Sequence, residues 1–219
     1  MAKLEWDKSG ERLWETGVEQ AALFLVDEAG KYSNGEAWNG LIGITESPSG
    51  AEPTALWAND KKYGELLSTE EFGGSIEAYM YPDGFKACNG EAQLVKGVSI
   101  TQQARKTFGL AYKTLVGNDV VGHKYGYKLH LVYGAKAAVS EKANQTINDS
   151  PEAMTMSWEF STTPVAVEGF EPTSHLIINS KDVDPEKLAA LEAMIYGGAD
   201  SEPELPLPDK VAELLGDAA

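Results

Sequence analysis

Residues 127–139 read Tyr-Lys-Leu-His-Leu-Val-Tyr-Gly-Ala-Lys-Ala-Ala-Val, and this stretch decides the fold. An apolar or aromatic residue stands at every second position from Tyr127 to Val139, which predicts a series on one face, whereas Lys128, His130 and Lys136 fall in the opposite phase. Because successive side chains of a strand point to opposite faces, this period of two predicts a strand with one buried and one solvated face. Such one-sided burial is typical of antiparallel sheets.

A second alternating stretch, residues 153–161, has Met154, Met156, Trp158 and Phe160 in one phase. The polar residues 141–151 are expected to join the two strands as a long loop. Shorter strand candidates separated by turn signals lie at residues 21–26, 41–45, 74–81, 94–101, 107–115 and 175–179. The fold class predicted is mainly β (α+β): an antiparallel β-sandwich or barrel of about eight strands with a flanking C-terminal helix.

The helix is predicted over residues 184–196. Asp184 is a suitable N-cap, Pro185 suits the first helical position, and Gly197 suits the end. The spacing of three apolar residues would place them on one face of this helix: Leu188, Leu191 and Ile195. The chain then divides into an N-terminal arm over residues 1–17, a β domain over 18–200 and a proline-rich C-terminal tail over 201–219, in which residues 209–215 suit one or two helical turns.

The chain has 219 residues, with 18 Lys and Arg against 34 Asp and Glu, and a formal charge of -16. This balance argues against gripping nucleic acid, because phosphate binding needs a basic surface. An acidic surface would let DNA pass without adhering to it. The same acidity also favours solubility, so charge alone leaves both interpretations open.

No residue pattern indicates catalysis. The sequence contains no glycine-rich phosphate loop, nucleophile elbow or metal-spaced set of His and Cys. Cys88 is expected to be an inert, buried thiol, and His123 and His130 are interpreted as turn and surface histidines without a third metal ligand. We therefore expect a protein that is not an enzyme and has no cofactor and no metal. With no apolar run near 20 residues and no apolar signal region at residues 1–7, synthesis in the cytoplasm is the default expectation.

Three aromatic residues, Trp38, Trp57 and Tyr63, lie in or beside a loop-rich stretch over residues 38–64. Aromatic side chains on a long loop can anchor a protein–protein contact. They can equally cover the monomer's own core. The sequence leaves these two interpretations open.

Four stretches resemble the major tail proteins, or tail tube proteins, of long-tailed, non-contractile bacteriophages. The resemblance spans roughly residues 38–180 and is carried by residues 38–45 (WNGLIGIT), 56–63 (LWANDKKY), 70–82 (EEFGGSIEAYMYP) and 158–165 (WEFSTTPV). It implies a β-sandwich flanked by a helix, and hexameric rings that stack into a hollow tube. The resemblance also implies that genomic DNA crosses this lumen on ejection without specific binding.

The resemblance further implies a virion protein of the tail, assembled in the host cytoplasm, with tape measure and tail terminator proteins among its partners and no membrane contact. A loop of one ring would contact the next, which we expect of residues 45–60. The interface candidates are Trp38, Glu46, Pro48, Pro53, Trp57 and Tyr63. We also expect acidic and neutral side chains to line the lumen.

Other function classes stay open. Within structural proteins, the alternatives are a tail terminator, a capsid decoration protein or the tube of a secretion system. From a different class, a β-sandwich module could bind carbohydrate or another ligand through exposed aromatic residues. An acidic hydrolase has the least support, because no acid–base pair stands out among the 34 acidic residues.

Overall fold

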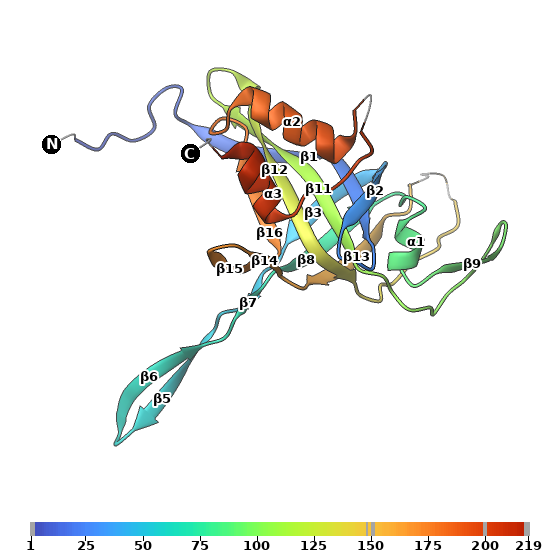
Figure 1. Ribbon diagram of the computed structural model, residues 1–219, viewed down its shortest axis with the longest axis horizontal. Coiled ribbons are helices and arrows are strands. Elements are labelled where there is room, and N and C mark those ends of the chain that lie inside the picture. Colours follow the sequence, from blue (N-terminus) through green and yellow to red (C-terminus); the bar gives the residue numbers. More distant parts are fainter. Residues whose placement is uncertain (1–2, 148, 150–151, 199–200, 217–219) are drawn as a thin grey trace.

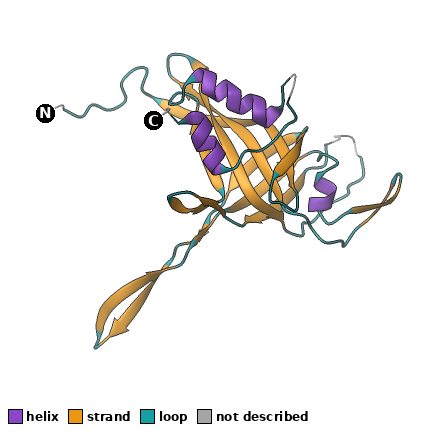
Figure 2. Ribbon diagram, in the orientation of Figure 1, coloured by secondary structure: helices purple, strands orange, loops and turns teal. Residues whose placement is uncertain are grey.

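The computed structural model describes residues 3–147, 149, 152–198 and 201–216, and these build a body around one curved antiparallel sheet (Figures 1 and 2). Eight strands form this sheet, and every pairing is antiparallel. In spatial order they are β2 (Tyr32–Ala37), β1 (Leu13–Val26), β11 (Phe108–Asn118), β12 (Gly122–Ala137), β13 (Met156–Thr162), β8 (Gly73–Ala78) and β3 (Leu41–Glu46), with β16 (His175–Asn179) pairing β12 beside β13. The predicted mainly β, antiparallel fold class is confirmed.

The deciding strand, β12, is interrupted by a bulge at Gly134. The backbone of Gly134 has a φ of 63°, and the register between β11 and β12 shifts there. A bulge moves all later side chains of a strand to the other face. The predicted single-face series is therefore wrong: Leu131 and Tyr133 pack on one side of the sheet, and Ala135 packs with Val132 on the other.

The central strands are buried on both faces, which corrects the expectation of one solvated face. One group of buried apolar side chains, which we call the inner cluster, fills the concave side of the sheet. In it, Trp38, Trp158 and Phe108 surround Phe85 of the short helix α1 (Phe85–Cys88). Burying each large apolar side chain contributes about 2 kcal/mol before conformational entropy is subtracted. Burial on two sides explains why β1 contains the continuous apolar run at residues 21–26 rather than an alternating one.

A second group of buried apolar side chains, which we call the outer cluster, lies between the other face of the sheet and two helices, α2 (Pro185–Tyr196) and α3 (Pro208–Leu215). Figure 2 shows these two helices together on one side of the sheet. The prediction for α2 is confirmed. The Asp184 carboxylate accepts hydrogen bonds from the backbone N–H groups of Glu186 and Lys187, at 2.9 and 3.1 Å. Its expected stripe, Leu188, Leu191 and Ile195, is buried against the sheet.

Both terminal segments are less separate from the body than the sequence suggested. Strand β1 begins at Leu13, so the last five residues of the expected 17-residue arm belong to the sheet. The proline-rich segment is packed as part of the body: Leu205 and Val211 are buried in the outer cluster, and the Tyr133 hydroxyl donates to the carbonyl of Pro206 at 2.8 Å. Helix α3 confirms the short C-terminal helix.

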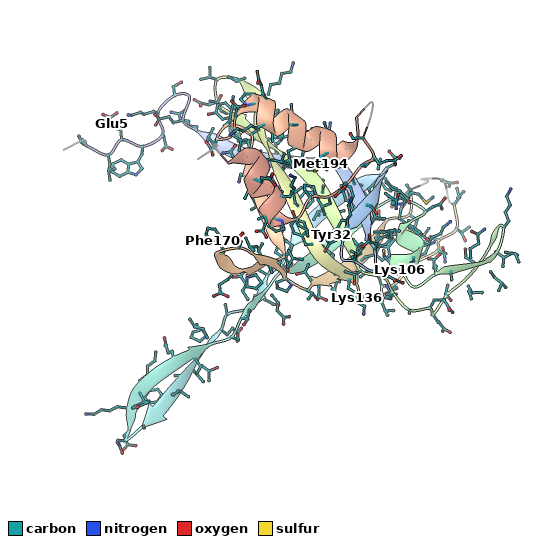
Figure 3. All side chains as sticks on the ribbon, in the orientation of Figure 1. Glu5, Tyr32, Lys106, Lys136, Phe170 and Met194 are labelled. Atoms are coloured by element: carbon teal, nitrogen blue, oxygen red, sulfur yellow. The ribbon has the colours of Figure 1, made fainter. Side chains whose placement is uncertain are left out.

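The remaining strands form small hairpins outside the sheet. Strands β9 (Ala92–Val95) and β10 (Val98–Ile100) turn at residues 96–97, so the single strand predicted over 94–101 is wrong. Strands β14 (Val165–Val167) and β15 (Phe170–Thr173) form a second hairpin, with Phe170 at its exposed end (Figure 3). None of the described helices is long and apolar enough to cross a bilayer.

Candidate functional site

A two-stranded hairpin projects far from the body, at the lower left of Figure 1. It continues the β3–β8 pair of the sheet outward. Next come β4 (Ser49–Gly50) with β7 (Glu70–Glu71), and then β5 (Pro53–Ala58) with β6 (Lys61–Leu67). We call residues 47–72 the projecting hairpin. Its structure corrects the expectation of a loop at residues 45–60, because most of these residues belong to paired strands.

The local sequence explains why the chain reverses at the tip. Asn59 and Asp60 both adopt positive φ angles, 48° and 61°. Two such residues form the two-residue turn that suits the twist of a hairpin, and Asn and Asp tolerate this conformation better than most residues. The tip is thus fixed by local chemistry, although β5 and β6 pair only with each other among the described strands.

The projecting hairpin exposes apolar side chains on both of its faces. The cross-strand pair Pro53 and Leu67 shares one face with Trp57, whereas Leu56 and Leu66 belong to the other. All of these are exposed, and Figure 3 shows the side chains of this segment standing away from the rest of the chain. An isolated two-stranded hairpin is at best marginally stable in water. Apolar residues on both faces of such a hairpin therefore indicate a surface that another molecule covers.

The structure brings five of the six sequence-predicted interface residues to the projecting hairpin or its root. Glu46 ends β3, Pro48 and Pro53 are exposed along the hairpin, and Trp57 and Tyr63 are 70% and 80% exposed. Tyr63 lies at the register shift between the pairs Leu56–Gly64 and Trp57–Lys62 and has no partner residue of its own.

Trp38 is different from these five. Its side chain is only 4% exposed and packs in the inner cluster, and its indole N–H donates to the Met80 carbonyl at 3.0 Å. Its assignment as an interface residue is wrong. Of the two interpretations left open for the aromatic residues, Trp38 fits the second, in which the side chain packs in the monomer's own core.

At the root of the projecting hairpin lies a group that we call the histidine cluster: Glu46, His130 and His175. His130 Nδ1 is 3.1 Å from His175 Nε2 and 3.4 Å from Glu46 Oε1. His130 is 3% exposed. Its interpretation as a surface residue is therefore wrong, and two further side chains that could bind a metal stand beside it. His123 lies elsewhere, with its ring edge-on to Trp14.

Sequence reasoning missed this cluster because three strands distant in the chain supply it. Strand β16 pairs with β12 so that His130 lies opposite Ile177 and Val132 opposite His175. The end of β3, which β13 and β8 separate from β12 in the sheet, reaches the same place because the sheet is curved. The one local signal is a histidine in the middle of the apolar series of β12, and that signal does not identify its partners.

Two residues of β11, Tyr112 and Thr114, contact the histidine cluster and help to fix its side chains. The Tyr112 hydroxyl donates to Glu46 Oε1 at 2.7 Å, and its ring stacks on His130 with centroids 4.6 Å apart. Thr114 Oγ1 lies 2.9 Å from His130 Nε2 and donates to Glu15 Oε1 at 2.6 Å. Burial lowers the pKa of His130, against the pull of Glu46 and Glu15, and it lowers the pKa of His175 to about 4. Both imidazoles are therefore neutral at pH 7.

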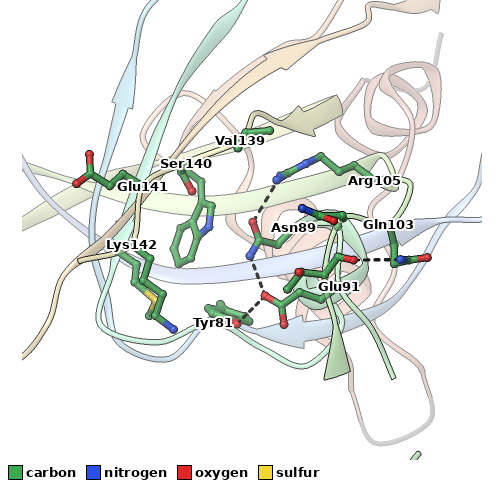
Figure 4. A pocket seen from close by; sticks show the side chains of 14 residues that line it. Tyr81, Asn89, Glu91, Gln103, Arg105, Val139, Ser140, Glu141 and Lys142 are labelled. Carbon is green, nitrogen blue, oxygen red and sulfur yellow. Dashed lines mark hydrogen bonds between the residues drawn. The ribbon is translucent and has the colours of Figure 1, made fainter. Parts of the chain in front are cut away.

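A hollow of about 480 Å³ lies on another side of the body (Figure 4). Its polar side chains bond mainly to one another: Tyr81 donates to Glu91, Asn89 donates to Glu91, and Arg105 donates to the Ala138 carbonyl at 2.8 Å. Among the described lining residues, the one hydroxyl that donates to a carboxylate is that of Tyr81, and Asn89 donates to the same Glu91 oxygen. This hollow has no arrangement that indicates catalysis.

Comparison with known proteins adds no family assignment. The chain matches no protein-family model, and no curated protein sequence resembles it significantly.

Proposed function

We propose that this chain is a structural subunit that polymerises into the tail tube of a long-tailed, non-contractile bacteriophage, as stacked hexameric rings. The observation that carries the proposal is the projecting hairpin. It places Trp57, Tyr63 and Leu67 far from the body and in contact with no core of their own. An element of this kind gains its stability from a neighbouring subunit, and a copy in the next ring would supply that contact.

The sheet supplies a second set of contacts. Among the described strands, β2 pairs only with β1, and β3 pairs only with β8. Residues 203–205 cover part of the outer edge of β2 through backbone hydrogen bonds with Tyr32 and Gly35, so the edge of β3 is the more open of the two. Such edges normally invite aggregation, and an ordered assembly can use them to join subunits. One head-to-tail contact that closes gives a ring, and a second that does not close gives a filament.

The charge agrees with a conduit for DNA. A net charge of -16 per chain means that a wall built from many copies carries a large negative charge. That wall repels phosphates and lets DNA slide. The proposal includes the expectation that acidic and neutral side chains line the lumen, that DNA passes without specific binding, and that the protein is not an enzyme.

The test is negative-stain electron microscopy of the purified chain and of a hairpin deletion across a range of concentrations. Deleting residues 53–67 leaves Ala51, Glu52, Ser68 and Thr69 as a four-residue loop between β4 and β7. We expect hollow filaments from the wild type, and a folded but non-polymerising deletion variant. The matched control is Phe170→Ser, which removes an equally exposed aromatic residue from another hairpin and should leave the filaments intact.

Filaments of normal length from the deletion variant would reject the role of the hairpin. Closed single rings at every concentration would favour a tail terminator, and a strict monomer that binds a glycan would favour a ligand-binding module. Either result would overturn the proposed function.

A further inference from the structure

We propose that Glu46, His130 and His175 form a binding site for one divalent transition metal ion of the Zn²⁺ class at the root of the projecting hairpin. This inference does not rest on the proposed tube function. Two imidazole nitrogens and a carboxylate oxygen form a donor set that suits Zn²⁺ and chemically similar ions, with a fourth position left for water.

The distances bring the donors close to the separations that such an ion requires. One ligand atom from each residue lies within 4.8 Å of the other two. A tetrahedral ion with bonds of about 2.0–2.2 Å holds its ligands about 3.3–3.6 Å apart. The 3.1 Å and 3.4 Å separations from His130 Nδ1 are already near this range. Glu46 has a side chain exposed enough to rotate into place, at 36%.

The hydrogen bonds around His130 leave its Nδ1 without a proton. Thr114 has a single hydroxyl proton, and it donates that proton to the Glu15 carboxylate. Thr114 Oγ1 can then only accept from His130 Nε2–H, so a neutral His130 carries its lone pair on Nδ1. This is the nitrogen that faces Glu46 and His175. A metal-bound histidine is held in the same way, with its outer N–H donated to a fixed acceptor.

The three candidate ligand atoms face one another with too few protons to pair them all, so a cation suits this place. His130 Nδ1 and Glu46 Oε1 are both acceptors and lie 3.4 Å apart. The Tyr112 proton is already used on Glu46, as an outer contact that orients the carboxylate. The only proton available between the three donor atoms is the one on His175 Nε2, which can serve His130. A metal ion would take the place of that proton, with the His175 proton moved to Nδ1, and would interact with one lone pair from each of the three side chains.

The location gives the site a structural consequence. Glu46 is the last residue of β3 before the projecting hairpin, His130 is in the central strand β12, and His175 begins β16. A bound ion would therefore tie the base of the hairpin to the middle of the sheet. Glu46 and His175 are more accessible than His130, so the ion would enter from their side.

The test is a titration of the chelator-treated, full-length chain with Zn²⁺ alone. Calorimetry measures the affinity, and native mass spectrometry measures the number of ions bound per chain. Co²⁺ in place of Zn²⁺ adds visible absorption as a report of the ligand geometry. The variants are Glu46→Gln and His175→Gln, and the matched control is His123→Gln, which removes the only histidine outside the cluster. Circular dichroism establishes that each variant is folded.

We expect one Zn²⁺ per chain in the wild type and in His123→Gln, with micromolar or tighter affinity and a raised melting temperature. Each cluster variant should bind at least about tenfold more weakly. Absence of stoichiometric binding in the wild type would overturn the proposal. Binding that survives undiminished in both cluster variants, or that is lost in His123→Gln, would place the ion elsewhere and overturn it as well.

Discussion

The ring of Phe72 stacks on the imidazole of His175, with the ring centroids 4.4 Å apart and the planes inclined by 29°. Phe72 is the last residue of the projecting hairpin, and His175 opens β16 in the body. The Phe72 carbonyl also accepts a hydrogen bond from Thr162 Oγ1 of β13, at 2.7 Å. Phe72 thus reinforces the backbone pairing that joins the base of the hairpin to the sheet.

Phe72→Ala should loosen this anchor. Loss of the stacked pair and of partly buried apolar surface should lower the free energy of unfolding by about 1–2 kcal/mol. Amide hydrogen exchange should also become faster at residues 46–50 and 70–73. The matched control is Phe170→Ala, because Phe170 is 81% exposed and should change neither quantity. Equal stability of the two variants would contradict the anchoring role.

The fold class and the helix were predictable because their signals are local. The alternation of buried and exposed side chains around Trp158, and the helix cap at Asp184, each depend only on neighbouring residues in the chain. The face change at Gly134 was not predictable, because it involves Tyr32 of β2 and Thr163, which follows β13, and both are distant in the sequence. The same limit applies to the candidate site: Trp57 and Tyr63 were identified from their type, but the burial of Trp38 and the meeting of His130 with His175 follow from the sheet order.

Gly134→Ala should be strongly destabilising. The residue has a positive φ, and an added Cβ would lie 2.1 Å from the Thr163 carbonyl oxygen. Backbone strain and a clash with another backbone segment should together cost more than about 2 kcal/mol, measured by urea unfolding. Gly43→Ala is the matched control in β3, because its Cβ would meet nothing within 4 Å. If both substitutions have similar effects, the bulge does not need glycine.

Leu205→Ala tests whether the proline-rich segment belongs to the core. Leu205 is buried against Tyr32 and Gly109, so truncation should leave a cavity and cost about 2–4 kcal/mol. Leu207→Ala, two residues further on and 43% exposed, should cost less than about 1 kcal/mol. Thermal unfolding of the two variants measures the difference. Equal melting temperatures would mean that this segment is not docked in solution.

The Cys88 thiol should resist alkylation until the protein unfolds. Cys88 is fully buried, and its desolvation, only partly offset by Lys106, raises the pKa of the thiol to about 12. At pH 8 the reactive thiolate is then on the order of one molecule in ten thousand, and the reagent has no access to it. Iodoacetamide labelling followed by mass spectrometry should be slow for the native chain and rapid in urea.

The same burial predicts a stability difference that depends on pH between the wild type and Cys88→Ala. Below pH 9 the thiol is protonated in both the folded and the unfolded chain, so its contribution to stability is fully present and constant. Between pH 9 and about 12 the unfolded thiol loses its proton while the folded thiol keeps it. The unfolded state then binds fewer protons, and the wild type loses about 1.4 kcal/mol of stability per pH unit from this group. Cys88→Ala lacks this loss, so the advantage of the wild type in urea unfolding should shrink steadily from pH 9 to 10.5. An advantage that stays constant over this range would mean that the folded thiol titrates normally, and the buried position of Cys88 would then be wrong.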